Sequence, residues 1–156
     1  MLKKLIYPFF LVLFFSSCGY TPIYLNSSET DFEISNFKVS GNTEVNSIVK
    51  NKLKKYLNNN HQKKYDVEIL TNYKKVSVAK DATGNTTNFK LIIELNLSYM
   101  EIDAEQKNQI KNIFFSEELN IKRNENNYEQ NNYEQIIIRN MTEMLTEKII
   151  LHLSKS

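Results

Sequence analysis

The sequence predicts an α+β domain in which a mostly antiparallel four-stranded sheet carries two helices on one face, in the order β-α-β-β-β-α. Four segments alternate apolar and polar residues, which is typical of half-buried strands, and two segments repeat apolar residues at helical spacing. The 156 residues suit a single domain with its own core. Because neither helix can bury its apolar stripe alone, we expect both on the apolar face of the sheet, leaving the other face polar.

The first strand is predicted over residues 32–39, with Ile34, Phe37 and Val39 directed inward. Their alternation slips by one residue, which indicates a β-bulge. Gly41-Asn42-Thr43 then offers a turn and a helix N-cap. The helix that follows is predicted over residues 45–58, and its apolar residues are Val45, Ile48, Val49, Leu53, Tyr56 and Leu57.

Three further strands are predicted in the middle of the chain. The second begins at Tyr65 and continues toward Val78, and residues 80–88 form a hairpin loop because Gly84-Asn85 readily adopts positive φ. The third strand, over residues 89–99, has the most regular alternation. After a turn at residues 103–108, the fourth strand places Ile113, Phe115, Leu119 and Ile121 on one face, with Glu117 as the exception.

The last element is predicted to be a helix over residues 133–153. Its apolar stripe consists of Ile137, Met141, Leu145 and Ile149, widened by Ile138, Met144 and Leu153. Its opposite side carries Arg139, Glu143, Thr146 and Glu147. The preceding residues 124–132 are polar and contain most of a short Asn-Tyr-Glu-Gln duplication, so we expect a loop there.

Composition and charge exclude several classes of protein. Three Gly exclude a Gly-rich phosphate loop, and one Cys with two His excludes a structural zinc site or a disulfide framework. The formal charge is +2, but Lys3 and Lys4 lie in a segment expected to be removed, which leaves 18 basic against 18 acidic side chains. A nucleic-acid binder would show an excess of basic side chains, so the sequence does not predict nucleic-acid binding.

No catalytic or metal site is predicted. His61 and His152 are about 90 residues apart with no cysteine partner and read as surface residues. Glu117 and Glu118 are adjacent in a strand, so their side chains point to opposite faces and cannot share a proton. No serine stands in a nucleophile-elbow pattern. We therefore expect neither an enzyme nor a protein with a cofactor.

The N-terminus has the pattern of a lipoprotein export signal. Lys3 and Lys4 precede an apolar run of 11 residues, 5–15, which as a helix spans roughly 16 Å, about half of a ~30 Å hydrocarbon core. The next residues, Ser16-Ser17-Cys18, resemble a lipobox, with Phe15 where leucine is usual. The sequence thus predicts a signal peptide at 1–17, a lipidated tether at 18–30 and one α/β sandwich domain at 31–156.

Cys18 is the predicted lipid attachment site. An ordinary signal peptide followed by a stray cysteine, or a buried thiol, is the alternative, but the only cysteine of the chain stands where lipidation requires it. Diacylglycerol and N-acyl chains contribute about 0.8 kcal/mol per buried methylene, which gives a stable anchor. Gly19, rather than aspartate, follows Cys18, and in the lipoprotein class this directs sorting to the outer membrane.

Four lysines, Lys74, Lys75, Lys80 and Lys90, lie around the central hairpin in sequence. They are candidates for a basic tip that contacts the phosphates of an anionic glycolipid or a protein partner. The alternative is an ordinary solvated loop in a lysine-rich chain.

The stretch CGYTPIY at residues 18–24, after an export signal and before the β-α-β-β-β-α pattern, resembles the lipopolysaccharide-assembly lipoprotein (LptE) family. Members often carry Cys-Gly-Phe-x-Pro-Leu-Tyr there. The resemblance implies a non-catalytic lipoprotein of the outer membrane, held by Cys18 and facing the periplasm. It would help assemble the LptD β-barrel and plug its lumen, with lipopolysaccharide as a candidate ligand. A near-neutral, Asn-rich exterior suits such a polar lumen.

Two other interpretations stay open. One is an accessory binding subunit of another outer-membrane transport or barrel-assembly complex, which co-purification would distinguish. The other is a periplasmic enzyme, which would lose activity when a histidine or carboxylate is replaced.

Overall fold

The computed structural model describes residues 32–57, 61–102 and 109–156. In chain order the elements are β1 (Phe32–Gly41), α2 (Thr43–Leu53), the 3-10 turn η2 (Lys54–Tyr56), β2 (Lys63–Lys80), β3 (Thr86–Glu101), β4 (Lys111–Lys122) and α3 (Asn127–Lys155). The predicted order β-α-β-β-β-α is confirmed. The export signal, the tether with Cys18 and the predicted turn at 103–108 lie outside the described residues.

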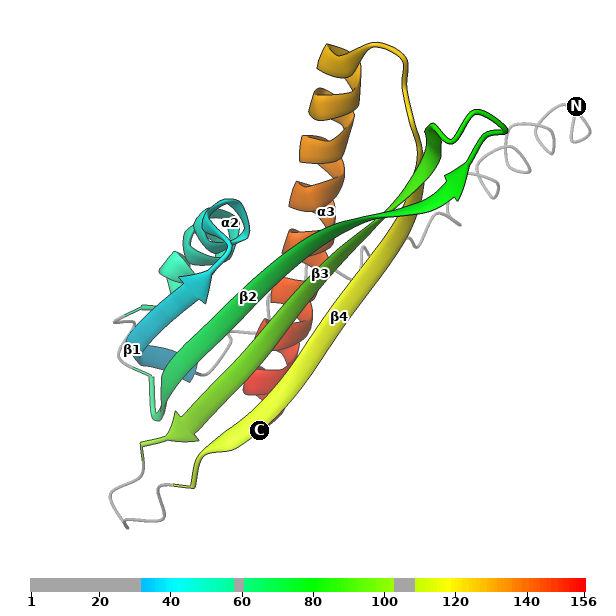
Figure 1. The fold of residues 1–156 in the computed structure, drawn as a ribbon. Coiled ribbons are helices and arrows are strands. Elements are labelled where there is room, and N and C mark those ends of the chain that lie inside the picture. Colours follow the sequence, from blue (N-terminus) through cyan, green and yellow to red (C-terminus); the bar gives the residue numbers. More distant parts are fainter. Residues whose placement is uncertain (1–31, 58–60, 103–108) are drawn as a thin grey trace, which may run out of the picture. The chain divides into compact units, whose positions relative to one another are not determined.

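The four strands form one sheet in the order β1-β2-β3-β4 (Figure 1). β1 runs parallel to β2, whereas β2–β3 and β3–β4 are antiparallel. The parallel pairing follows from the intervening α2, which carries the chain back across the sheet. The register of β1 shifts between Ile34 and Asn36, which confirms the predicted bulge.

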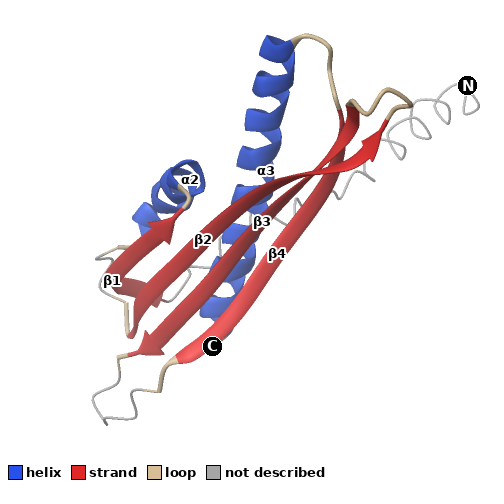
Figure 2. Ribbon diagram, viewed as in Figure 1, coloured by secondary structure: helices blue, strands red, loops and turns tan. Residues whose placement is uncertain are grey.

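Both helices cover the same face of the sheet, as Figure 2 shows, and the prediction of one covered face is confirmed. α2 packs against β1 and α3, and α3 packs over β3 and β4. The core between them contains the fully buried side chains Phe32, Ile34, Leu53, Tyr65, Ile69, Leu91, Ile93, Leu95, Leu97, Leu145, Ile149 and Leu153. The opposite face carries cross-strand polar pairs such as Lys38–Glu68 at 2.7 Å.

α2 begins as predicted and ends earlier. The side-chain oxygen of Asn42 accepts hydrogen bonds from the N–H groups of Glu44 and Val45, both at 3.1 Å, and so caps the helix. The helix was expected to reach residue 58, but α2 ends at Leu53 and η2 follows. Leu57 is extended and forms a parallel bridge with Ile34 of β1, so the chain has left the helix by that point.

α3 begins at Asn127, so the prediction of a loop over 124–132 is wrong from residue 127 onward. Asn126 caps this helix by accepting from the N–H groups of Tyr128 and Glu129. Within the first two turns, Gln130 and Glu134 are buried. The polar composition of this segment favoured a loop, but the amide of Gln130 and the carboxylate of Glu134 are bonded to each other inside the fold, so the segment is helical.

Two side chains of α3 lie elsewhere than expected. Met144 is 40% exposed instead of packing in the core, and Thr146 is fully buried instead of lying on the solvent side. The hydroxyls of Thr142 and Thr146 donate to the carbonyls of Ile138 and Thr142, each at 2.7 Å. These bonds satisfy the hydroxyls within the helix, so threonine can be buried where α3 has to pack against both the sheet and α2.

The buried hydroxyl of Tyr65 leads to a prediction about the stability of the core. Its side chain is fully buried and its hydroxyl has no hydrogen-bond partner among the described residues. We expect Tyr65→Phe to raise the free energy of unfolding by about 1 kcal/mol at pH 7, because it removes an unsatisfied buried group. Tyr99→Phe is the control, since the Tyr99 hydroxyl lies 2.8 Å from His152 Nε2 and its loss should destabilise.

The same substitution should change the alkaline limit of stability. Burial, followed by the charge of Glu101 and by Tyr99, raises the pKa of Tyr65 to about 12 from 10.0. Between these values the unfolded chain loses the proton while the folded chain keeps it, so stability falls as the pH rises. In urea unfolding, Tyr65→Phe should therefore lose less stability at alkaline pH than the wild type. A smaller loss should remain in this variant, because burial also raises the pKa of Tyr73 to about 12. A Tyr65→Phe protein less stable than wild type at pH 7 would contradict the assignment.

Candidate functional site

One feature that is open to a partner is the part of the sheet beyond the end of β1. β1 pairs with β2 from Lys63 to Thr71, and β2 then continues to Lys80 with β3 as its one neighbour among the described strands. We call residues 72–90, the second half of β2, the loop and the start of β3, the hairpin arm. Figure 1 shows the arm continuing past the end of β1.

The loop at the end of the arm is ordered by one carboxylate. Asp81 Oδ1 accepts from the N–H groups of Thr83 and Asn85, both at 2.9 Å, and from the Thr83 hydroxyl at 2.6 Å. The hydroxyl bond is the main cause that lowers the pKa of Asp81. Gly84 has φ of 88°, as predicted for this hairpin, although the strands reduce the loop to residues 81–85.

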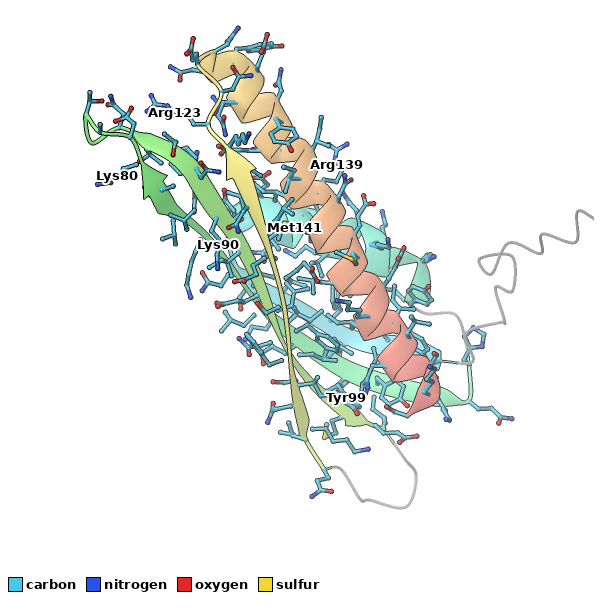
Figure 3. All side chains as sticks on the ribbon, turned by 90° about the vertical axis from the view of Figure 1, so that its right-hand side faces the viewer. Lys80, Lys90, Tyr99, Arg123, Arg139 and Met141 are labelled. Atoms are coloured by element: carbon cyan, nitrogen blue, oxygen red, sulfur yellow. The ribbon has the colours of Figure 1, made fainter. Side chains whose placement is uncertain are left out.

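The four candidate lysines lie on two faces of the arm. Lys74 and Lys90 lie on the face away from the helices, where each pairs at 3.1 Å with a glutamate of the neighbouring strand, Glu94 or Glu118. The hydrogen bonds from Lys74 and then Asn72 lower the pKa of Glu94. Lys75 points toward the helices, and Lys80 ends β2 without a paired carboxylate in the described part of the chain (Figure 3 labels Lys80 and Lys90). The structure therefore does not gather these four charges into one patch, and their contact with a glycolipid stays a prediction.

Lys75 belongs to a polar network that joins the arm to α3. Its ammonium donates to Glu134 Oε1 at 2.5 Å and lies 4.2 Å from the centre of the Phe89 ring. The same Glu134 oxygen accepts from Gln130 Nε2, and Gln130 Oε1 accepts from the N–H of Asn124. We call Lys75, Glu134, Gln130 and Asn124 the arm network. It holds β2, the β4–α3 connection and the first turns of α3 together.

The residues considered for catalysis have structural partners. Glu117 pairs with Lys148 of α3 and Glu118 with Lys90, so the two carboxylates lie on opposite faces, as predicted. His152 is half-buried, with its Nε2 2.8 Å from the Tyr99 hydroxyl. In the ranges that the structure describes, no three His, Cys, Asp or Glu side chains are grouped so that they could hold a metal ion.

Sequence reasoning missed an apolar surface on the outer side of α3. Tyr133, Ile136, Met144 and Leu151 are 51%, 58%, 40% and 56% exposed. Their spacing of three to eight residues places them on one side of the helix, next to a groove of about 320 Å³ between α3 and β4 that Leu119 and Met141 help to line. This alignment makes the outer side of α3 a candidate surface for contact with a partner. The helical spacing of these four residues could have been found in the sequence. It was overlooked because Met144 is assigned to the buried stripe there.

Comparison with known proteins gives a family and a fold. The model of the family "LptE: Lipopolysaccharide-assembly" matches residues 30–153, which is well over half of the chain. The sequence matches no curated protein. Among the described residues, no helix is long and apolar enough to cross a membrane.

Two solved structures resemble the fold. The rare lipoprotein B from Shewanella oneidensis has a TM-score of 0.56 at 10% identity, covering 78% of this chain and 95% of that one. A minor lipoprotein from Acinetobacter baumannii has a TM-score of 0.50 at 10% identity, covering 78% and 91%. At this identity the likeness concerns the arrangement of strands and helices.

Proposed function

Because this chain belongs to the LptE family of lipopolysaccharide assembly, we propose that it is a non-catalytic lipoprotein that helps to assemble the β-barrel LptD and occupies its lumen. In this proposal Cys18 carries the acyl chains that hold the protein at the periplasmic side of the outer membrane. The barrel would deliver lipopolysaccharide to the cell surface, and this protein would close its lumen to other solutes.

The observation that carries the proposal is the family match over nearly the whole folded domain. The surface is compatible with it. The uncovered sheet face consists largely of polar side chains bonded in pairs across strands, such as Asn36–Asp66 at 2.8 Å and Ser98–Asn112 at 2.7 Å. Pairs of this kind can face a polar, hydrated lumen without leaving charges unsatisfied. The apolar stripe of α3 could supply the less polar part of the contact.

The test is an affinity pull-down of the tagged, full-length protein from detergent-solubilised outer membranes. We expect the LptD barrel to be recovered in an approximately one-to-one complex. The Cys18→Ala variant should lose stable attachment to the membrane, because it has no thiol to acylate. Cys18→Ser is the matched variant, since it also lacks the thiol and should behave in the same way.

Three outcomes would count against the proposal. Recovery of the lipoprotein alone would remove the support for a barrel partner. Recovery with a different outer-membrane assembly would favour the accessory-subunit interpretation. Membrane retention of Cys18→Ala at the wild-type level, after a carbonate or high-salt wash, would contradict lipid anchoring through Cys18.

A further inference from the structure

In the described part of the chain, the hairpin arm leaves one edge of β2 without a neighbouring strand. β1 stops at Gly41, opposite Thr71, and the chain turns away into α2. α3 packs over β3 and β4 and reaches this part of β2 through the Lys75–Glu134 pair, on the face that the helices cover. Among the strands that the structure describes, β2 is therefore paired on one side only from residue 72 onward, as the view in Figure 1 shows.

The direction of the free backbone groups follows from Thr71. The carbonyl of Thr71 accepts from the N–H of Asn42 at 3.2 Å, so the backbone groups of Thr71 point toward the β1 side. Alternate residues of a strand point their N–H and C=O groups to the same side. Tyr73, Lys75 and Ser77 therefore present their backbone groups to the open edge, while Asn72, Lys74 and Val76 direct theirs to β3.

Exposed edges are commonly guarded by lysine, proline or a bulge. This stretch contains no proline, and its register shifts come only after Ser77. Between residues 72 and 78 the two lysines are drawn away from the edge: Lys74 to Glu94 of β3 and Lys75 to Glu134 of α3. Lys80 stands only at the end of β2, after the register shifts. The side chains that stay free beside the edge are the β-branched Val76 and Val78, which are 45% and 47% exposed.

We propose that the β2 edge at Tyr73, Lys75 and Ser77 binds an extended segment of a protein partner, which adds to the sheet as a strand in line with β1. The backbone groups would provide the hydrogen bonds, as in other cases of strand addition. Val76 and Val78 would favour a segment with apolar side chains at alternate positions on that face. That the segment comes from the LptD barrel rests on the proposed function, whereas the edge itself does not.

Amide hydrogen exchange tests the proposal on the full-length protein, free and in the complex isolated by the pull-down. When the protein is free, the N–H groups of Tyr73, Lys75 and Ser77 should exchange rapidly. In the complex they should slow by roughly 100-fold or more, because each gains a hydrogen bond in a sheet. The amides of Tyr65, Val67 and Ile69 serve as controls, since β1 and β3 already flank that part of β2.

A matched pair of variants separates the backbone from the side chain. Ser77→Pro removes the edge N–H, which makes no bond to β3, and its ring hinders an added strand. Ser77→Ala removes only the hydroxyl, which lies 2.9 Å from that of Thr86. We expect Ser77→Pro to lower recovery of the partner at least about tenfold and Ser77→Ala to leave it near wild type. If Ser77→Pro does not fold, the exchange measurement on the wild-type protein still decides.

The outcomes distinguish this proposal from the proposed function. Recovery of the barrel with unchanged exchange at the three amides would overturn strand addition and leave the proposed function standing. A different bound protein that protects the three amides, with protection lost in Ser77→Pro, would support the edge and refute the barrel. Protection that appears in the isolated protein as its concentration rises would instead indicate edge-to-edge pairing of two copies, and would overturn the proposal.

Discussion

Replacing Gly41 with alanine is expected to lower the free energy of unfolding by about 3 kcal/mol or more. Gly41 has φ of +107°, a region that residues with a side chain rarely adopt, and this conformation alone costs roughly 1–2 kcal/mol. An alanine Cβ would also lie 2.0 Å from the carbonyl oxygen of Thr71. That oxygen is backbone in the next strand, so relief requires moving β1 away from β2.

Gly84→Ala is the control for this substitution. Gly84 also has positive φ, +88°, but a Cβ there meets no atom within 4 Å. It should lose only the conformational part, about 1 kcal/mol. Urea unfolding of both variants measures the difference, and equal losses would contradict a role for the close contact between Gly41 and Thr71. The contact bears on the proposed strand addition because β1 ends at Gly41, opposite Thr71.

Glu134→Ala is expected to lower the free energy of unfolding by about 1–3 kcal/mol. The carboxylate is buried, with 7% of the residue exposed, and it accepts from both Lys75 and Gln130. Its removal leaves two donors without an acceptor beneath the hairpin arm. The loss should fall below that of a fully buried ion pair, because the Lys75 side chain is 31% exposed and can turn to solvent.

Glu147→Ala tests whether burial is the cause. Glu147 lies on the same helix and pairs with Lys52 at 2.7 Å, but its side chain is 53% exposed. An exposed pair contributes about 0–1 kcal/mol, so this variant should differ little from wild type. Glu134→Ala should also speed amide exchange in the first turns of α3, which the arm network holds. Equal unfolding energies for the two variants would contradict the importance of the network.

The regular parts of the fold could be predicted from local patterns. Alternation in β3 and helical spacing in α2 depend on neighbouring residues of the same segment, and the bulge after Ile34 was visible as a slip in that alternation. Asn42 was recognisable as an N-cap because its side chain bonds the next few N–H groups. Such interactions span only a few residues, so a single sequence displays them.

The start of α3 could not be predicted in the same way. Residues 127–132 have loop-like composition, and their helical state depends on the cap at Asn126 and on the buried bonds of Gln130 and Glu134. Lys75, 59 residues before Glu134, supplies part of that environment. Likewise, the candidate lysines were neighbours in sequence, but the pleat of β2 placed Lys74 and Lys75 on opposite faces, with glutamates of different elements.

By itself, the sequence determined the order of the elements, the covered and the polar faces of the sheet, and the resemblance that led to the LptE family. It also determined Cys18 as the candidate anchor, which remains a prediction. Only the tertiary structure decided where β1 stops along β2, which lysines are neutralised and which side of α3 is exposed. The physical reason is that hydrophobic periodicity is a property of one segment, whereas strand register and ion pairing depend on residues brought together from distant parts of the chain.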